Sequence, residues 1–508
     1  MIPSRYLIPI ILFIASYFIF AYNLEGQPWS GDEVYSLASG AVYFNLLKDG
    51  DLGNPCWNDV QHCKLLAVTG YTSSYGPVRN IFVGLGKTIM TGNDKGDFYD
   101  WSCVWVPSCF SAKTIPPHDE LVAGRFFSPI FGSLSVVIAY GIGRLLFNKL
   151  TGLLFSLTLL FEPLWLWNSR VIMTEVYLGF FILLTTFLLL YSLKGTKLKK
   201  KYFIAGAIAF GLTINTKETA IYIIIPIVAI ILLKVPSAIK LISLKDKHHL
   251  KKSILLSALF ILVSTVAIVA TNPAYYKDVT YPLESMKHDA NSVGFLSFPS
   301  SNNDNIFRVF STLHSTIMPY FFSYYDSPSK DYPYLSLSWD NPGTYSTVPI
   351  SLFFIVGLFY ILNKRSSEDT SSKIFLIVWL GMSLIFTILV VREYRMERYF
   401  LPLLLPMMLI SSYGLARFVG SFDKKIQIGF VSLAVLNNII AVFVFWKLIY
   451  FSPTFYWTNP LTQITMQSSF EYSITIISAL TFIAAFLIMI CYKIIKKENA
   501  GQITSNKL

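Results

Sequence analysis

Long apolar blocks separated by shorter polar segments set the pattern of this chain. A helix of about 17 to 25 apolar residues is long enough to cross a hydrocarbon core of about 30 Å. The blocks are too many to be one cleaved signal peptide. The pattern therefore predicts an all-α polytopic membrane protein with about twelve spans. They lie near residues 6–22, 121–147, 151–167, 171–193, 202–216, 219–235, 253–271, 348–363, 373–391, 399–418, 426–449 and 473–495.

Composition supports the same class, since 54% of the 508 residues are hydrophobic and only 14% are charged. Soluble domains carry about 25% charged residues, so an ordinary cytosolic enzyme is excluded. The net charge of +12 reflects basic residues in every second connection, which is typical of cytoplasmic loops and not of nucleic-acid binding. We therefore expect both termini inside, and the connections 23–120, 168–170, 217–218, 272–347, 392–398 and 450–472 outside.

The first outer connection is too long for a simple linker, so it must carry structure of its own. Helical spacing of apolar residues predicts helices along the membrane surface over residues 33–47 and 78–90. Four of the five cysteines fall in this loop, and their proximity favours disulfides between Cys56 and Cys63 and between Cys103 and Cys109. A four-thiolate zinc site is the alternative, but the spacings are not the short gaps of zinc ribbons.

Two consecutive carboxylates, Asp32 and Glu33, stand where the first span meets the outer loop. An enzyme that deprotonates a hydroxyl at a membrane surface needs a carboxylate held in such a place. Alone, Asp32 is explained as well by a helix N-cap, which would satisfy free backbone amides. The other charges expected on the outer face decide between these interpretations.

Basic residues on the outer face run against the positive-inside bias, so a favourable partner is required. Arginine and lysine both suit phosphate, and as a group they predict a site for a lipid phosphate. Each single arginine is explained equally well by internal ion pairing, for example Arg125 with Glu33 or Arg395 with Glu397. The candidate phosphate ligands are Arg125, Arg170, Lys217, Arg395 and Arg398.

The order of several short motifs resembles that of the GT-C glycosyltransferases, and in particular the protein O-mannosyltransferases of glycosyltransferase family 39. The resemblance covers residues 1 to about 230 and, more loosely, 390 to 410, and no single motif is specific. The motifs are Asp32-Glu33, Ser74-Tyr75-Gly76-Pro77 with Gly86-Lys87, Arg125-Phe-Phe-Ser128 through Tyr140, Ser169-Arg170 with Glu175, Thr216-Lys217 and Arg398-Tyr399-Phe-Leu-Pro402.

This resemblance implies an enzyme that transfers one sugar, mannose or another hexose, from a dolichyl- or polyprenyl-phosphate donor to an acceptor hydroxyl on the extracytoplasmic face, with inversion. It implies that Asp32 is the catalytic base and that Glu33 orients Arg125. Two motifs depart from the family: its usual His-Pro-Pro is Tyr75-Gly76-Pro77 here, and its usual Asp after Ser-Arg is Glu175. A role given to that histidine does not transfer to this chain.

Three modules follow from this interpretation: a catalytic transmembrane module (1–272) that includes outer loop 23–120, an aromatic-rich outer loop (273–347), and C-terminal transmembrane helices (348–508). The aromatic residues of that loop suit interfacial anchors better than a sugar-facing wall. No histidine pair has metal-ligand spacing, but a divalent metal at the donor phosphate stays open. The alternatives are a transferase acting on a glycan or a lipid, of the aminoarabinose-transferase type, and a lipid or solute transporter, which an internal repeat would favour. Sugar, acceptor and oligomeric state are not indicated.

Overall fold

The computed structural model describes residues 4–27, 31–57, 76–93, 116–195, 197–237, 247–277, 280, 348–363, 370–391, 401–450, 477–478 and 480–493. Within these ranges the regular structure is helical and contains no strand. The expected all-α class is therefore confirmed for the part of the chain that is described.

A helix lies at each predicted span. Five helical segments are long and apolar enough to cross a membrane: residues 118–146, 174–192, 250–271, 370–387 and 401–419. Because length and composition assign no side, the count of twelve and the inside-outside arrangement stay predictions. The helices are α1 (Ser4–Ala21), α5 (Phe127–Leu146), α6 (Lys149–Leu160), α8 (Thr174–Ser192), α9 (Lys200–Ile214), α10 (Ile224–Ser237), α11 (Lys247–Thr271), α15 (Val348–Leu362), α16 (Thr370–Val391), α17 (Leu401–Val419), α18 (Lys424–Tyr450) and a last helix over Leu480–Lys493.

Two of the predicted spans are each divided into two helices, whereas the sequence predicted one continuous helix for each. The span expected at 121–147 is divided into α4 (His118–Gly124) and α5, with Arg125 and Phe126 between them. The span expected at 151–167 is divided into α6 and α7 (Pro163–Asn168). Its break has a local cause, since the Glu162 carboxylate accepts a hydrogen bond of 2.6 Å from the Trp165 amide and Pro163 starts the new helix. In the predicted span 219–235, a 3-10 helix, η5 (Glu218–Ile223), precedes α10.

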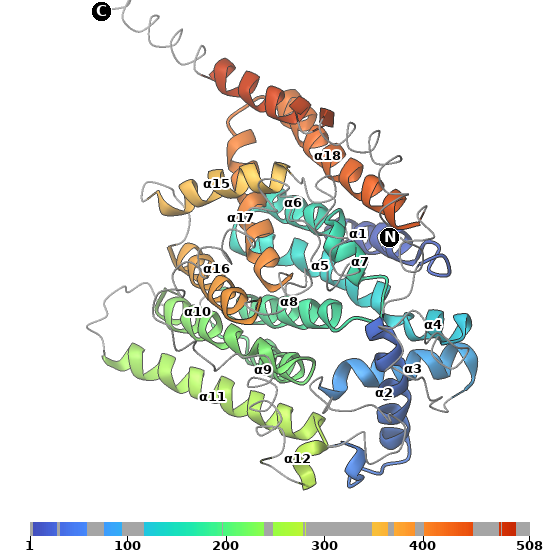
Figure 1. Ribbon diagram of the computed structural model, residues 1–508. Coiled ribbons are helices and arrows are strands. Elements are labelled where there is room, and N and C mark those ends of the chain that lie inside the picture. Colours follow the sequence, from blue (N-terminus) through green and yellow to red (C-terminus); the bar gives the residue numbers. More distant parts are fainter. Residues whose placement is uncertain are drawn as a thin grey trace, which may run out of the picture.

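The bundle is organised around α5, α8 and α17 (Figure 1). Helix α5 packs against α1, α6 and α8, and α8 packs against α9. Helix α17 is almost wholly buried and contacts α15, α6 and α16. Helix α11, at the edge, exposes apolar side chains such as Leu255 and Leu262, which suits contact with lipid.

The long connection after α1, predicted to lie outside, forms both helices that the sequence predicted. They are α2 (Gly31–Lys48) and α3 (Pro77–Thr91), and they lie with α4 at one end of the bundle (Figure 1). Helix α3 begins with Pro77 and ends at Gly92, whose left-handed backbone (φ of 67°) donates a capping hydrogen bond of 3.0 Å to the Thr88 carbonyl. A short 3-10 helix, η1 (Pro55–Trp57), follows α2.

Of the four outer-loop cysteines only Cys56 lies in the described residues, and it is disulfide-bonded. Cys63, Cys103 and Cys109 lie outside them, so the two predicted pairings stay predictions. The aromatic-rich loop 273–347 is described only at residues 273–277 and 280, which include the short helix α12 (Ala274–Lys277). The three predicted modules are likewise untested.

Helices α2 and α3 cross at a pair of glycines. A Cβ on Gly84 would lie 2.1 Å from the Gly40 carbonyl oxygen and 2.5 Å from the Phe44 Cβ. A Cβ on Gly40 would lie 3.0 Å from the Gly84 backbone nitrogen. The two helix backbones are therefore in contact, and neither position has room for a side chain.

We predict that Gly84→Ala lowers the free energy of unfolding by about 1–3 kcal/mol, because the methyl group must push α2 and α3 apart. The measurement is thermal or denaturant unfolding of the full chain in detergent. The matched control is Gly381→Ala in α16, where nothing lies within 4 Å of the added Cβ. That change should be neutral or stabilising by about 0.5–1 kcal/mol. Equal effects of the two substitutions would contradict the close crossing.

Candidate functional site

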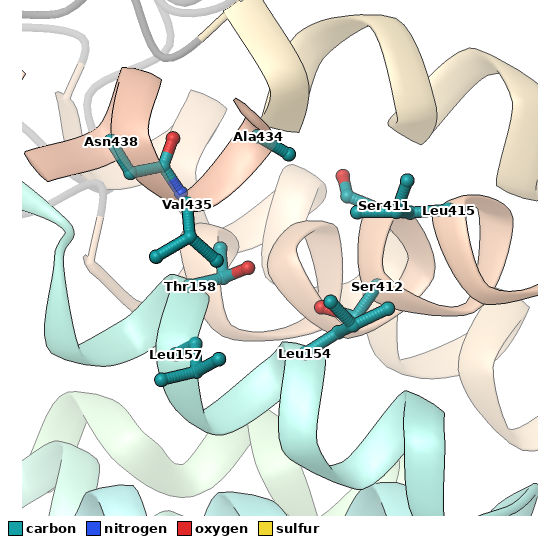
Figure 2. A pocket seen from close by; sticks show the side chains of 9 residues that line it. All are labelled: Leu154, Leu157, Thr158, Ser411, Ser412, Leu415, Ala434, Val435 and Asn438. Carbon is teal, nitrogen blue, oxygen red and sulfur yellow. The ribbon is translucent and has the colours of Figure 1, made fainter. Parts of the chain in front are cut away.

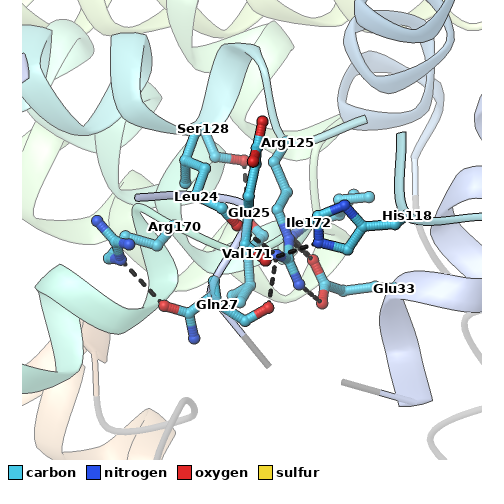
Figure 3. A network of polar contacts seen from close by, with 10 residues as sticks. All are labelled: Leu24, Glu25, Gln27, Glu33, His118, Arg125, Ser128, Arg170, Val171 and Ile172. Carbon is cyan, nitrogen blue, oxygen red and sulfur yellow. Dashed lines mark hydrogen bonds and ion pairs between the residues drawn. The ribbon is translucent and has the colours of Figure 1, made fainter. Parts of the chain in front are cut away.

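A buried polar cluster lies where α2, α3, α5 and α8 meet. Its centre is the α7–α8 turn, which we define as residues 169–173 between α7 and α8. All five residues of this turn are buried. Five separate segments bind it or the first two residues of α8; one of them is α5, whose Ser128 Oγ donates to the Val171 carbonyl over 2.9 Å. Figure 3 shows the part of the cluster around Glu33, Arg125 and Arg170.

A two-pronged ion pair between Glu33 and Arg125, both fully buried, is bound to this turn. Arg125 donates from Nε to Glu33 Oε1 over 2.8 Å and from Nη2 to Oε2 over 2.7 Å. Glu33 Oε1 also accepts from the Ile172 amide over 2.7 Å. Arg125 Nη1 donates to the carbonyls of Leu24 and Gln27. The pair therefore ties α2, the residues after α1, the start of α5 and the α7–α8 turn together, and it supports the ion-pair interpretation of Arg125.

Arg170 binds the end of α1. Its guanidinium makes five hydrogen bonds, one from Nε to Gln27 Oε1 and four to backbone carbonyls. The last carbonyls of a helix lack intrahelical partners and carry partial negative charge, so a cation there is favourable. All five N–H groups of Arg170 are thereby used by the chain. The carbonyls belong to Ile19, Phe20, Tyr22 and Asn23.

Two further cations meet the first residues of α8. Lys217 Nζ lies 3.0 Å from Glu175 Oε1, and both side chains are buried. Arg79 Nη1 donates to Thr174 Oγ1 over 2.9 Å. Because Thr174 and Glu175 are consecutive, Arg79 and Lys217 approach α8 at the same end.

Tyr275 of α12 interacts electrostatically with Glu218, the residue after Lys217. Burial, reinforced by the negative charge of Glu218, raises the pKa of the Tyr275 hydroxyl. The Tyr275 hydroxyl, protonated at neutral pH in any case, is therefore held in its neutral form.

The predicted site residues are placed as follows. Glu33, Arg125 and Arg170 belong to one network, and Lys217 joins it through Glu175. Asp32 is the second residue of α2, so it lies in the first helical turn and not at the N-cap; its side chain is outside the described residues. Arg395 and Arg398 also lie outside the described residues.

Sequence reasoning missed Arg79, Thr174 and the Ile172 amide. A signal for Arg79 was available, since a basic residue in the first turn of a helix is opposed by the helix dipole and requires a reason. No sequence pattern marks a backbone amide as a ligand, so the Ile172 contact required the structure.

Within the described ranges, no three His, Cys, Asp or Glu side chains come together as a metal-binding group. Glu33 is engaged by Arg125 and Glu175 by Lys217. The two described carboxylates of this cluster are thus engaged by cations. A small cavity between α6, α17 and α18 (Figure 2), lined by Thr158, Ser412 and Asn438 among others, draws its lining from none of the elements that carry the polar cluster and contains no charged residue.

We predict that Arg125→Lys lowers the free energy of unfolding by about 3–5 kcal/mol. A lysine cannot form the two-pronged contact and also reach both carbonyls, which leaves a buried charge poorly paired. The measurement is unfolding of the full chain in detergent, with Arg144→Lys at the exposed last turn of α5 as the control. Arg144→Lys should change stability by less than about 0.5 kcal/mol. If the two variants were equally stable, the ion pair would not hold the site together.

The sequence of the central part of the chain matches a known family. Residues 110–275 match the family model described as dolichyl-phosphate-mannose-protein mannosyltransferase. This segment is less than half of the chain, and it contains Arg125, Arg170, Glu175 and Lys217. No curated protein matches the sequence.

Solved structures share the fold. The crystal structure of the Archaeoglobus fulgidus oligosaccharyltransferase with Zn and sulfate aligns with a TM-score of 0.52 and 15% identity, over 86% of this chain and 53% of that chain. The same archaeal enzyme in complex with an inhibitory peptide and a dolichol-phosphate aligns with a TM-score of 0.50 and 14% identity, over 88% of this chain and 56% of that chain. ArnT from Cupriavidus metallidurans bound to undecaprenyl phosphate aligns with a TM-score of 0.44 and 12% identity, over 94% of this chain and 76% of that chain. A TM-score this low supports no conclusion about the fold.

This chain spans about half the length of the archaeal oligosaccharyltransferase, and identities this low establish the fold alone. The matched family is a mannosyltransferase family and the archaeal protein is an oligosaccharyltransferase, which agrees with the glycosyltransferase class predicted from the sequence. The chain therefore has the GT-C glycosyltransferase fold, and over residues 110–275 it resembles the dolichyl-phosphate-mannose-protein mannosyltransferase family.

Proposed function

We propose that the chain is a membrane glycosyltransferase that moves one sugar, mannose or another hexose, from a dolichyl- or polyprenyl-phosphate donor to an acceptor hydroxyl on the extracytoplasmic face. The observation that carries this proposal is the Glu33–Arg125 pair bound to the Ile172 amide. It joins the outer-loop carboxylate to the segment that matches the mannosyltransferase family.

Because of this ion pair, we assign different roles to the adjacent residues Asp32 and Glu33. Both oxygens of Glu33 are held by Arg125, and one also accepts from Ile172, so Glu33 is not available to receive a proton. Asp32, one residue earlier in the first turn of α2, is the proposed base. A positioned base of this kind contributes about 10²- to 10⁴-fold to a rate.

The proposed reaction is a single displacement. The acceptor oxygen attacks the sugar C1 from the face opposite the phosphate, and its proton passes to the Asp32 carboxylate. The bond between C1 and the phosphate oxygen breaks, and its electron pair stays on that oxygen. The products are the glycosylated acceptor, with inverted configuration at C1, and the lipid phosphate. The step requires a base near the acceptor and cations near the leaving phosphate.

The cations differ in what they contribute. Arg170 has all its N–H groups on chain acceptors, and Arg125 is shared between Glu33 and two carbonyls. We therefore give these two arginines a framework role in place of the phosphate contact expected from the sequence. Lys217 is the described candidate for the donor phosphate, and Arg395 and Arg398 remain proposed ligands from the later outer segment.

We predict that Asp32→Asn reduces transfer by about 10²- to 10⁴-fold, because the amide cannot accept the acceptor proton. The measurement is release of product from a labelled polyprenyl-phosphate hexose by purified full chain in detergent, with peptide, glycan and lipid acceptors tried in parallel. The control is Asp119→Asn, an exposed carboxylate in the first turn of α4, which should transfer at the wild-type rate.

Two results would contradict this assignment. A folded Asp32→Asn protein with wild-type transfer would show that Asp32 is not the base. A wild-type protein that transfers no sugar to any acceptor, but moves lipid across liposomes, would show that the class is a transporter.

A further inference from the structure

A series of hydrogen bonds joins α2, α3 and α8, and the proposed mechanism does not use it. Ser39 of α2 donates from Oγ to Asn80 Oδ1 of α3 over 3.3 Å. The same oxygen accepts from Nε and Nη2 of Arg79 over 3.0 and 2.6 Å. Arg79 Nη1 then donates to Thr174 Oγ1 of α8 over 2.9 Å. All four side chains are buried, and we call these four residues the α2–α8 link.

The start of α3 is anchored on the bundle, so α3 gives the α2–α8 link a fixed reference. The Val78 amide donates to the carbonyl of Asn215, the residue after α9, over 3.3 Å. A Cβ on Gly76 would collide with that same carbonyl oxygen, so the close approach requires glycine. Arg79 adds a side-chain bond from the first turn of α3 to Thr174. The first turn of α3 is therefore held between the end of α9 and the start of α8.

Helix α2 is tied to this framework at two places. In its first turn, Glu33 binds Arg125 and the Ile172 amide. Ser39 binds Asn80 at a point about 9 Å further along the helix axis, at 1.5 Å per residue. A single attachment fixes where a helix stands but lets it rotate and tilt about that point. The second attachment, through the α2–α8 link, removes this freedom.

We propose that Arg79 and Asn80 are positioning residues that fix the rotation of α2, and with it the position of Asp32, relative to the start of α8. This inference rests on the proposed function, in which Asp32 is the base. Asp32 precedes Ser39 on the same helix by nearly two full turns, so a rotation of α2 at Ser39 turns position 32 by the same angle. A displacement of about 1 Å can cost about 10²-fold in rate.

The contacts of Arg79 and Asn80 suit this role. Each of the three guanidinium nitrogens of Arg79 donates to an oxygen of the chain. Asn80 Oδ1 accepts three hydrogen bonds, two of them from Arg79 and one from Ser39. A side chain without an acceptor at position 80 would leave N–H groups of a buried guanidinium unpaired and would release Ser39. A carboxylate of the same size would keep the acceptor.

The test measures kcat and the donor KM for labelled polyprenyl-phosphate hexose, using the full chain in detergent and the acceptor that the wild type glycosylates. We expect Asn80→Leu to lower kcat by about tenfold to a hundredfold and to leave the donor KM unchanged, because a displaced base weakens only the transition state. Asn80→Asp, which keeps the acceptor, should restore kcat to near the wild-type value. Ser39→Ala, which removes only the tie to α2, should lower kcat by less than Asn80→Leu.

The matched control for Ser39→Ala is Ser133→Ala in α5. The Ser133 hydroxyl is also buried, but it donates to the Pro129 carbonyl of its own helix and joins no second element. This control should transfer sugar with the wild-type kcat and KM. A difference between the two serine variants therefore measures the tie between α2 and α3 and not the loss of a buried hydroxyl.

The outcomes separate this inference from the proposed function. If the wild type transfers sugar, but folded Asn80→Leu and Ser39→Ala proteins keep the wild-type kcat, the inference alone is overturned. A fall in kcat that Asn80→Asp does not reverse, or a loss that lies in the donor KM, overturns it too, because Asn80 would then act in packing or in donor binding. If Asn80→Leu does not fold, Ser39→Ala decides, since a kcat equal to that of Ser133→Ala contradicts the inference. A wild type that transfers no sugar contradicts both proposals.

Discussion

The buried pair of Glu33 and Arg125 is the interaction on which the rest of the site depends. Two charges removed from water stabilise a structure only when geometry and additional hydrogen bonds satisfy them. Here the guanidinium fork holds both carboxylate oxygens at 2.7 and 2.8 Å, a backbone amide adds a third contact to Glu33, and two carbonyls complete Arg125. Because these partners come from four separate segments, the pair fixes where the outer-loop helices stand on the bundle.

The α7–α8 turn and the first residues of α8 bring the charged side chains of the cluster together. Arg170 joins it to the end of α1, Ile172 joins it to Glu33, and the next two residues receive Arg79 and Lys217. One short segment therefore sets the distance between the acidic start of α2 and the cations at α8. The proposed acid–base step at α2 and the proposed phosphate stabilisation at α8 would require such a rigid separation, since reacting groups must be held in near-attack geometry.

Much of this arrangement could be predicted from the sequence, and the limits have physical causes. Apolar blocks gave a helix at each expected span, and periodicity placed α2 and α3 within one or two residues of their ends. The pairing of Glu33 with Arg125 was expected, because it was one interpretation of a buried arginine and also the one implied by the resemblance. The break at Glu162 was missed, since hydropathy does not register a side chain that caps a new helix. The break after α4 was missed too, and no side chain caps the start of α5 there. The hydrogen bonds of Arg170 to the backbone carbonyls at the end of α1 could not be predicted, because no sequence pattern marks a backbone carbonyl as a partner.

The most direct test of the central claim is an experimental structure of the full chain bound to a polyprenyl phosphate. The account predicts the phosphate beside Lys217 at the N-terminus of α8, with the Glu33–Arg125 pair intact next to it. A phosphate bound elsewhere, for example in the cavity between α6, α17 and α18, with the cluster at the α7–α8 turn empty of ligand, would contradict it.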